Sequence, residues 1–167
     1  MYQDYPVPLP RVLLDRPPTA RALLRGSEAY PALGGEVLFY PFQDGSLLLV
    51  RAAGLPGDGF LGFHIHTYGD CCIGGDVPFN CAGGHYDPEG GVPHPNHAGD
   101  LPVLLSNAGR AFAVVYTSRF TPTEVIGRSV IIHGMPDDFR SQPAGDSGSR
   151  IACGAIEALS VQSPSNT

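Results

Sequence analysis

Residues 62–100 read GFHIHTYGDCCIGGDVPFNCAGGHYDPEGGVPHPNHAGD and contain five of the six histidines in the chain. The sixth, His133, lies in the short apolar run SVIIHG further along the sequence. Neutral imidazole is a good nitrogen donor near pH 7, which makes histidine the commonest metal ligand among side chains. This concentration of histidines therefore predicts a metal site.

The start of this stretch has the alternation of a β-strand. In FLGFHIH (60–66), the apolar Phe63 and Ile65 alternate with His64 and His66. Alternate residues of a strand share a face, so both histidines are expected to point the same way. The remainder, residues 67–100, is rich in Gly and Pro and has no strand or helix periodicity. A loop of this length in a compact domain is usually functional or disordered, and its histidines favour a functional loop.

The histidines and one carboxylate divide into two ligand sets. Three nitrogens and one carboxylate make a tetrahedral zinc set, and four nitrogens make a square-planar or tetragonal set that favours copper(II). Both sets are complete only if His85 serves both metals through its two ring nitrogens. The zinc set is then His85, His94, His97 and Asp100, and the copper set is His64, His66, His85 and His133.

Around this stretch the chain is composed of short apolar runs with turn signals between them. Eight such runs in about 150 residues, with little helix, predict an all-β sandwich or barrel. Thr121, Pro122 and Glu124 form a capping-box pattern for one helical turn. The predicted strands are 20–27, 35–42, 46–54, 60–66, 101–107, 111–118, 128–134 and 150–159, with a second long loop at 134–149.

Length and composition indicate one globular domain. The 167 residues are 43% hydrophobic and 16% charged, and the net charge of −6 argues against nucleic acid as a partner. No apolar run approaches the length of a membrane span. We expect an irregular N-terminal arm at 1–18, the folded domain at 19–160 and a loose tail at 161–167.

Five motifs occur in order: GFHIHTYGD, CAGGHYDP, HAGDLP, VIIHGMPDD and GSRIACG. Together they resemble the Cu/Zn superoxide dismutase family, particularly its bacterial branch, from about residue 19 to residue 156. The resemblance implies a Greek-key, immunoglobulin-like β-sandwich or barrel of about eight strands with two long functional loops. It also implies an enzyme that converts two superoxide anions into dioxygen and hydrogen peroxide, by redox cycling of copper beside a structural zinc.

The resemblance assigns the same two ligand sets as the donor count and adds roles for further residues. Asp137 matches an aspartate that hydrogen-bonds ligands of both metals, and Arg150 matches the arginine that attracts the anion beside the copper. The copper-side nitrogen of His85 is expected to take up a proton when copper is reduced. The loop 134–149 matches the family's electrostatic loop, although Arg140 is its only cation. Family members form dimers through different surfaces, so a homodimer is possible.

The resemblance also implies a disulfide between Cys71 and Cys153, and Cys72 and Cys81 could form a second. The pairings Cys72–Cys153 and Cys81–Cys153 stay open on sequence alone. Disulfides persist in oxidising compartments, whereas the N-terminus does not read as a signal peptide. The chain as written therefore favours the cytoplasm, with the periplasm or the extracellular space as the alternative.

The main rival function is a superoxide-dismutase-like protein that binds or stores copper without turnover. Arg150, Asp137 and all four expected copper ligands are present in the sequence. The enzyme is therefore the favoured interpretation.

Overall fold

The structure, a computed structural model, describes residues 16–73 and 76–160. Most of the expected N-terminal arm (1–18) and all of the expected tail (161–167) lie outside the described residues. Among the residues described, no helix is long and apolar enough to cross a membrane.

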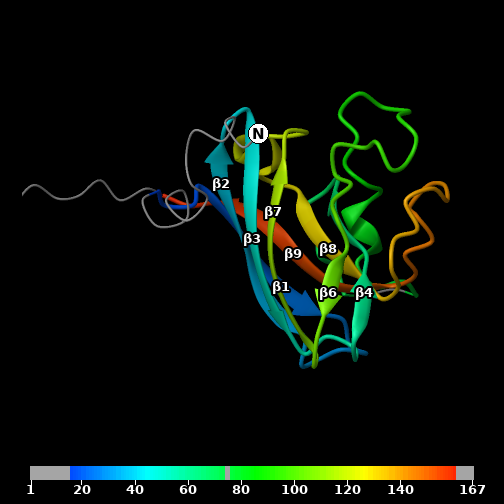
Figure 1. The fold of residues 1–167 in the computed structure, drawn as a ribbon. Helices are drawn as coiled ribbons and strands as arrows, with labels where there is room; N and C mark the ends of the chain where they lie inside the picture. Colours follow the sequence, from blue (N-terminus) through cyan, green and yellow to red (C-terminus); the bar gives the residue numbers. More distant parts are fainter. Residues whose placement is uncertain (1–15, 74–75, 161–167) are drawn as a thin grey trace, which may run out of the picture.

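Nine antiparallel strands make up the fold of the described residues (Figure 1). Seven of them form one curled sheet in the order β5-β8-β9-β1-β2-β3-β7, and β4 pairs with β6 in a small second sheet. The bounds are β1 Ala20–Gly26, β2 Gly34–Phe42, β3 Gly45–Ala53, β4 Gly59–Leu61, β5 Phe63–His66, β6 Leu104–Ser106, β7 Arg110–Thr117, β8 Ser129–His133 and β9 Arg150–Ala158.

The predicted strand 60–66 is divided at Gly62 into β4 and β5, which belong to different sheets. Gly62 donates its N–H to the carbonyl of Met135 and accepts a hydrogen bond from the His133 N–H, both at 2.8 Å. A β-carbon at Gly62 would lie 2.9 Å from that of Ser147, so a side chain would collide at this bend. This bent segment accounts for nine strands where eight runs were expected.

The chain connects the small sheet to both ends of the curled sheet, through the bend at Gly62 to β5 and through a turn to β7. β3 lies beside β7, a tight turn bridges Asn107 and Arg110 between β6 and β7, and β6 pairs with β4. In space the order is β3-β7-β6-β4, which is a Greek key because the chain leaves β3 for β4 and returns through β6 to β7. The expected all-β Greek-key fold is confirmed.

The core lies inside this curled sheet. Phe63 and Ile65 are fully buried in it, beside Phe39, Leu48 and Ile132. Burying a side chain of this size stabilises the fold by roughly 1.5–3 kcal/mol. β1, in the middle of the sheet, alternates, so that Ala20, Ala22 and Leu24 point inward while the residues between them are more exposed. In β5 the alternation expected from the sequence correctly places Phe63 and Ile65 on the core face.

β5 and β8 are buried on both faces. The core covers one face, and the long loops cover the other, since segments 67–100 and 134–149 project on the same side of the molecule (Figure 1). The loops include two short 3-10 helices, η1 (Asn80–Ala82) and η2 (Pro122–Val125). In η2 the Glu124 carboxylate accepts hydrogen bonds from the Thr121 N–H and hydroxyl, as the capping-box pattern indicated.

Candidate metal centre

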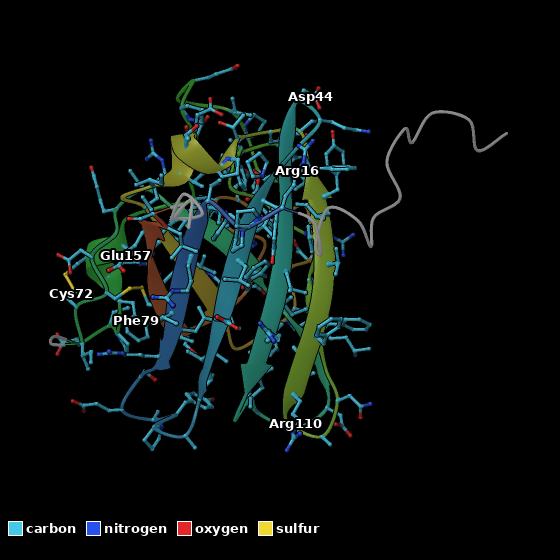
Figure 2. All side chains as sticks on the ribbon, turned by 90° about the vertical axis from the view of Figure 1, so that its left-hand side faces the viewer. Arg16, Asp44, Cys72, Phe79, Arg110 and Glu157 are labelled. Atoms are coloured by element: carbon cyan, nitrogen blue, oxygen red, sulfur yellow. A yellow bond between two sulfur atoms is a disulfide. The ribbon has the colours of Figure 1, made fainter. Side chains whose placement is uncertain are left out.

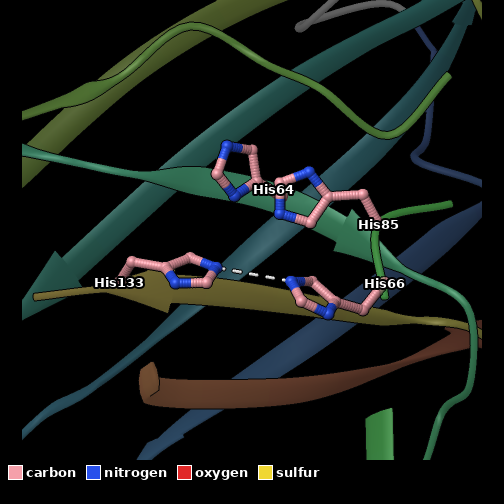
Figure 3. Close-up of side chains that lie close together, drawn as sticks. All are labelled: His64, His66, His85 and His133. Carbon is pink, nitrogen blue, oxygen red and sulfur yellow. Dashed lines mark hydrogen bonds between the residues drawn. The ribbon is translucent and has the colours of Figure 1, made fainter. Parts of the chain in front are cut away.

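Four histidines from three segments meet on the loop-covered side of β5 and β8. His64 and His66 project from β5, His133 ends β8, and a backbone bridge between His66 and His85 brings the loop alongside. One nitrogen of each ring lies within 4.8 Å of the others (Figure 3). The structure therefore brings together the four residues expected to bind copper.

The hydrogen bonds of these rings determine which nitrogens are free. His66 Nδ1 lies 2.9 Å from the Gly83 carbonyl, and His133 Nδ1 lies 3.3 Å from the Gly148 carbonyl. A carbonyl can only accept, so both Nδ1 atoms carry the proton in the neutral ring. The two Nε2 atoms then carry no hydrogen, and their lone pairs face one another across 3.3 Å (Figure 3).

The other two rings of this set leave nitrogens without a partner. His64 Nε2 contacts the Asp137 carboxylate at 2.7 Å, which leaves His64 Nδ1 buried and without a hydrogen bond. The Nε2 of His85 is also buried and without one. Buried polar atoms are costly when unpaired, and a cation among these nitrogens would satisfy all four.

Burial lowers the pKa values of His66, His85 and His133, which keeps these three imidazoles neutral. Loss of hydration lowers the pKa of His133 to about 3 and that of His85 to about 4, and it holds the pKa of His66 well below its usual value. Neighbouring histidines lower these pKa values further, whereas hydrogen bonds to Gly148, Asp100 and Gly83 oppose the shift. Neutral imidazole is the form that binds metal.

A second group of donors surrounds the carboxylate of Asp100. His85 Nδ1 lies 2.7 Å and His94 Nδ1 3.2 Å from Oδ1, and His97 Nδ1 lies 3.0 Å from Oδ2. Ligands about 2 Å from a tetrahedral zinc are about 3.3 Å apart, so this spacing suits that ion. His85 is the one residue that belongs to both groups, with its two ring nitrogens facing opposite sides.

The Asp100 carboxylate is prepared for this role by its hydrogen bonds. Burial alone would raise its pKa, but the hydrogen bond with His85 and the adjacent His94 and His97 hold the pKa well below the usual range. Oδ2 also accepts the backbone N–H of His97 at 2.9 Å, which tightens the short turn between them. Asp100 is therefore an anion at neutral pH, as a zinc ligand must be.

The Asp137 carboxylate contacts one histidine of each donor group. It contacts His64 Nε2 at 2.7 Å and His94 Nε2 at 2.9 Å and accepts the Phe139 N–H at 2.7 Å. Burial would raise the Asp137 pKa, but these hydrogen bonds lower it, so the group stays charged. Gly145 packs so closely here that a β-carbon would collide with the Asp137 carboxylate and the His94 ring. Such contacts fix the orientation of ligand rings.

Arg119 is a contributor that the sequence did not reveal. Its Nη1 donates to the carbonyls of Pro95, His97 and Asp100 at 3.0, 2.9 and 3.3 Å. These bonds hold the backbone of the loop that carries the second donor group. They involve main-chain acceptors, and the flanking sequence SRF contains no pattern that would indicate them.

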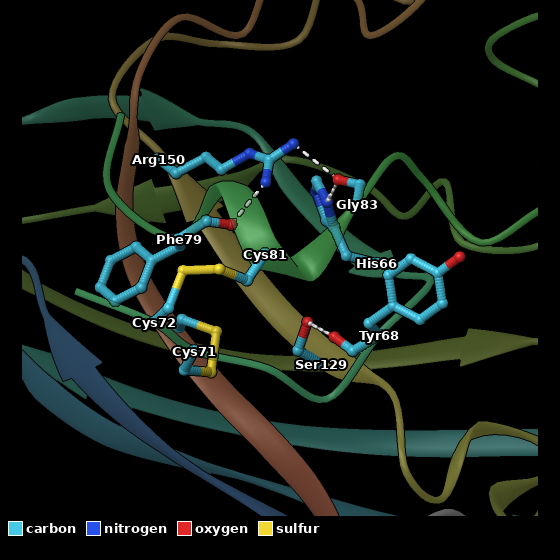
Figure 4. The surroundings of a disulfide bond; sticks show 10 residues. His66, Tyr68, Cys71, Cys72, Phe79, Cys81, Gly83, Ser129 and Arg150 are labelled. Atoms are coloured by element: carbon cyan, nitrogen blue, oxygen red, sulfur yellow. Dashed lines mark hydrogen bonds between the residues drawn. A yellow bond between two sulfur atoms is a disulfide. The ribbon is translucent and has the colours of Figure 1, made fainter. Parts of the chain in front are cut away.

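Arg150 begins β9, and its guanidinium is half-buried beside the first donor group. Nη1 donates to the carbonyl of Phe79 and Nη2 to that of Gly83, both at 2.6 Å (Figure 4). Its charge adds to the lowering of the pKa of His66 and of His133. The Gly83 carbonyl accepts from Arg150 and from His66 together, and this couples the cation to the ring.

The backbone of Phe79, whose carbonyl accepts from Arg150, has an uncommon conformation. Its φ is 59°, in the left-handed region, which costs a bulky residue roughly 1–3 kcal/mol. Its side chain is buried against Ala82, Ile131 and Cys153. The surrounding contacts therefore support a strained residue at the Arg150 contact.

Both disulfides considered in the sequence are present in the structure. Cys71 is bonded to Cys153 across 82 positions, and Cys72 is bonded to Cys81 (Figure 4). A third donor group, Asp70 with Cys72 and Cys81, has both of its sulfurs in this second bond, so they are not thiolate ligands. The longer bridge ties the loop to β9 and contributes roughly 4 kcal/mol on the chain-entropy model.

Comparison with known proteins gives matching results from sequence and structure. Residues 33–156 match the family described as copper/zinc superoxide dismutase. A Cu-Zn superoxide dismutase of Deinococcus radiodurans is 35% identical, over 85% of this chain and 86% of the relative. The solved Cu/Zn superoxide dismutase of Brucella abortus superposes with a TM-score of 0.74 at 31% identity, covering 83% of this chain and 99% of that one. A double mutant of a SOD-like protein from Bacillus subtilis superposes with a TM-score of 0.70 at 29% identity, covering 82% and 96%.

Proposed function

The chain belongs to the copper/zinc superoxide dismutase family, and from this premise we propose which of its residues carry out the reaction. Its activity is the disproportionation of two superoxide anions to dioxygen and hydrogen peroxide, with copper and zinc as cofactors. Copper supplies the one-electron redox chemistry when it is bound. The remaining question is what each side chain does.

We assign the copper to His64, His66, His85 and His133 and the zinc to His85, His94, His97 and Asp100, with His85 bridging the two ions. The observation that carries this assignment is the set of buried ring nitrogens without hydrogen bonds: His64 Nδ1, His85 Nε2, His94 Nδ1 and His97 Nδ1. Each of them faces one of the two groups, and Asp137 or a backbone carbonyl holds the opposite nitrogen of His64, His66, His94 and His133.

Arg150 is proposed to bind the superoxide anion beside the copper ligands. Its two bonds to Phe79 and Gly83 hold the guanidinium in one place, so the positive charge needs no rearrangement when the anion arrives. Because the chain carries a net charge of −6, this local cation has to overcome the overall field.

His85 is proposed to deliver a proton. Its Nε2 has no partner in the protein, while Nδ1 lies against Asp100. The Nε2 atom can therefore hold a proton whenever it does not bind an ion, and Asp100 keeps the ring in the same orientation in both states.

The deciding experiment is metal analysis combined with a superoxide assay on the purified full chain. The assignment predicts one copper and one zinc per chain, and catalytic loss of superoxide that disappears in His133→Ala together with most of the copper. His94→Ala should lose zinc selectively. Stoichiometric copper binding with no superoxide turnover would instead support the copper-storage alternative.

We also propose a homodimer. Phe60 of β4 and Leu105 of β6 are directly paired across the small sheet and are 55% and 57% exposed, and Phe112 of β7 is 72% exposed. Large apolar side chains gathered in this way are typical of protein interfaces. β7 lies at one edge of the solvent-facing sheet in Figure 2, with Arg110 at its lower end. Sedimentation should give a dimer for the native chain and a monomer for Leu105→Glu, and a monomeric native chain would exclude it.

A further inference from the structure

The two disulfides of the long loop have different structural roles. Cys71–Cys153 joins the loop to β9, whereas Cys72–Cys81 joins two points of the loop that are nine positions apart. The second bridge therefore adds no attachment to the barrel. What it can determine is the internal shape of the turn that contains η1.

That turn carries both of the carbonyls that hold Arg150. Cys81 lies two residues after Phe79 and two before Gly83, and those two carbonyls accept from Nη1 and Nη2 of Arg150 at 2.6 Å (Figure 4). Cys72 also contacts this turn through its backbone, because its carbonyl accepts the Phe79 N–H at 3.0 Å. The covalent bond and this hydrogen bond fix residues 79–81 against Cys72.

The backbone conformation of Phe79 explains how the Cys72–Cys81 bridge can affect Arg150. A phenylalanine with φ of 59° has other, less strained conformations available, and each of them would turn its carbonyl in another direction. Burial of its side chain fixes the ring. Rotation of the peptide plane is opposed by the Ala82 N–H, which donates to the Phe79 carbonyl at 3.1 Å, and by the bridge. Opening the bridge removes a constraint on that rotation and thereby loosens the Nη1 contact of Arg150.

We propose that Cys72 and Cys81 are positioning residues for the anion site: their disulfide keeps the Phe79 and Gly83 carbonyls where Arg150 needs them and so raises the affinity for superoxide. This inference rests on the proposed role of Arg150. Cys81 is exposed and Cys72 half-buried, whereas Cys153 is buried, so a thiol reductant reaches the Cys72–Cys81 bridge first.

The test uses the full chain loaded with copper and zinc and the double variant Cys72→Ser/Cys81→Ser. Azide is the probe for the anion site, with its dissociation constant read from the copper(II) absorption bands, and kcat/KM is measured for superoxide. A well-placed local charge raises the encounter rate by about 10- to 1,000-fold. Displacing it should cost roughly three- to tenfold in both quantities, with copper and zinc content unchanged.

Arg150→Gln shows how much azide affinity and kcat/KM are lost when the guanidinium is absent. Combining it with Cys72→Ser/Cys81→Ser tests whether the bridge acts through Arg150. If the bridge acts through Arg150, adding the serine changes to Arg150→Gln causes no further loss. An additional full-size loss in the triple variant would overturn the proposal, because the bridge would then act elsewhere.

The remaining outcomes separate this inference from the proposed function. Unchanged azide affinity and kcat/KM in the double variant overturn the inference, and if Arg150→Gln still weakens both, the proposed function stands. If Arg150→Gln changes neither quantity, both fail. Loss of copper from the double variant also counts against the inference, since the bridge would then hold the metal site.

A second measurement covers the case in which the double variant does not fold. A dithiol reductant gives two electrons and two protons to the bridge and becomes its own disulfide, leaving Cys72 and Cys81 as thiols. Native protein treated until only these two cysteines are alkylatable should show the same weaker binding of azide. Unchanged binding after this treatment overturns the proposal.

Discussion

His66 and His133 direct their Nε2 atoms at each other across 3.3 Å while the Nδ1 of each ring faces a backbone carbonyl. Neither neutral ring has a hydrogen left to place between the two Nε2 atoms. Two lone pairs at that distance repel unless a cation lies beside both. The predictions below begin from this arrangement.

Metal binding should stabilise the folded chain strongly. A ligand that binds only the native state at 100 times its dissociation constant adds about 2.7 kcal/mol. For a domain of this size that corresponds to a rise of roughly 5–10 °C in Tm. Calorimetry of chelator-treated protein, before and after adding zinc and copper, measures it. Equal Tm values with and without the ions would contradict the assignment of the buried nitrogens.

The metal-free protein should lose stability on mild acidification. The folded pKa values of His85, about 4, and His133, about 3, lie below the unfolded value of 6.5. From pH 6.5 down to about 4 the unfolded chain binds protons that the folded chain does not, so the free energy of unfolding falls as the pH falls. Each histidine contributes up to about 1.4 kcal/mol per pH unit.

Urea denaturation of the metal-free chain at pH 7, 6 and 5 checks this pH dependence. His133→Gln should flatten the slope by about a third, because it removes one of the three histidines with lowered pKa values, which are His66, His85 and His133. A stability that is constant over this range would show that these rings titrate normally in the folded chain.

Replacing Asp137 with Asn should weaken copper more than zinc, because the Phe139 N–H and His94 both lie on Oδ1, which keeps the amide oxygen there and turns the NH2 toward His64. The carboxylate accepts from His64 and His94 together, whereas an amide has one oxygen and directs its NH2 at one of the rings. Loss of such a partner typically costs 10- to 100-fold in metal affinity. Chelator competition measures both dissociation constants. Retained copper affinity in Asp137→Asn would mean that the other contacts orient His64.

Gly145→Ala should damage the same contact by steric means. The φ of Gly145 is 67°, and its β-carbon would collide with Asp137 and His94. Gly90 is the matched control, because its φ is 72° but nothing lies near its β-carbon. Gly90→Ala should cost about 1–2 kcal/mol of stability from backbone strain alone. Gly145→Ala should cost a further 1–3 kcal/mol or so and lower zinc content, and equal effects would exclude the collision.

Arg119→Lys should speed the release of zinc by roughly threefold to tenfold, which is at or below the low end of the range for residues that support ligands. Lysine keeps the charge but cannot reproduce the fixed geometry with which Nη1 reaches three carbonyls. Release is timed by transfer to a chromogenic chelator. Arg110→Lys, at the opposite end of β7, is the control and should leave the rate unchanged.

The sequence predicted the alternation of the strand that carries His64 and His66 because this alternation is a local property. Phe63 and Ile65 lie in the core and His64 and His66 on the opposite face, as period two requires. The division at Gly62 was not predictable, because it depends on contacts with Met135, His133 and Ser147 that only the folded chain brings together.

Hydrogen bonds to backbone carbonyls could not be predicted from the sequence either. The carbonyls of Phe79, Gly83 and Gly148 have no side-chain signature, and neither do the three acceptors of Arg119. The cysteine pairing remained open because four cysteines allow three connectivities. The path of the loop, which places Cys71 beside β9 and Cys72 beside Cys81, decides among them.

The bridge between Cys71 and Cys153 has a consequence for limited proteolysis. Every proposed ligand except His64 and His66 lies between the two bridged positions. A protease that cuts once at the exposed turn Glu89–Gly91 separates His85 from His94 in sequence, yet the two fragments stay joined through the sulfur atoms. A nicked molecule thus keeps all its proposed ligands in one covalent unit, and it should separate into two bands only when the gel is run with reductant.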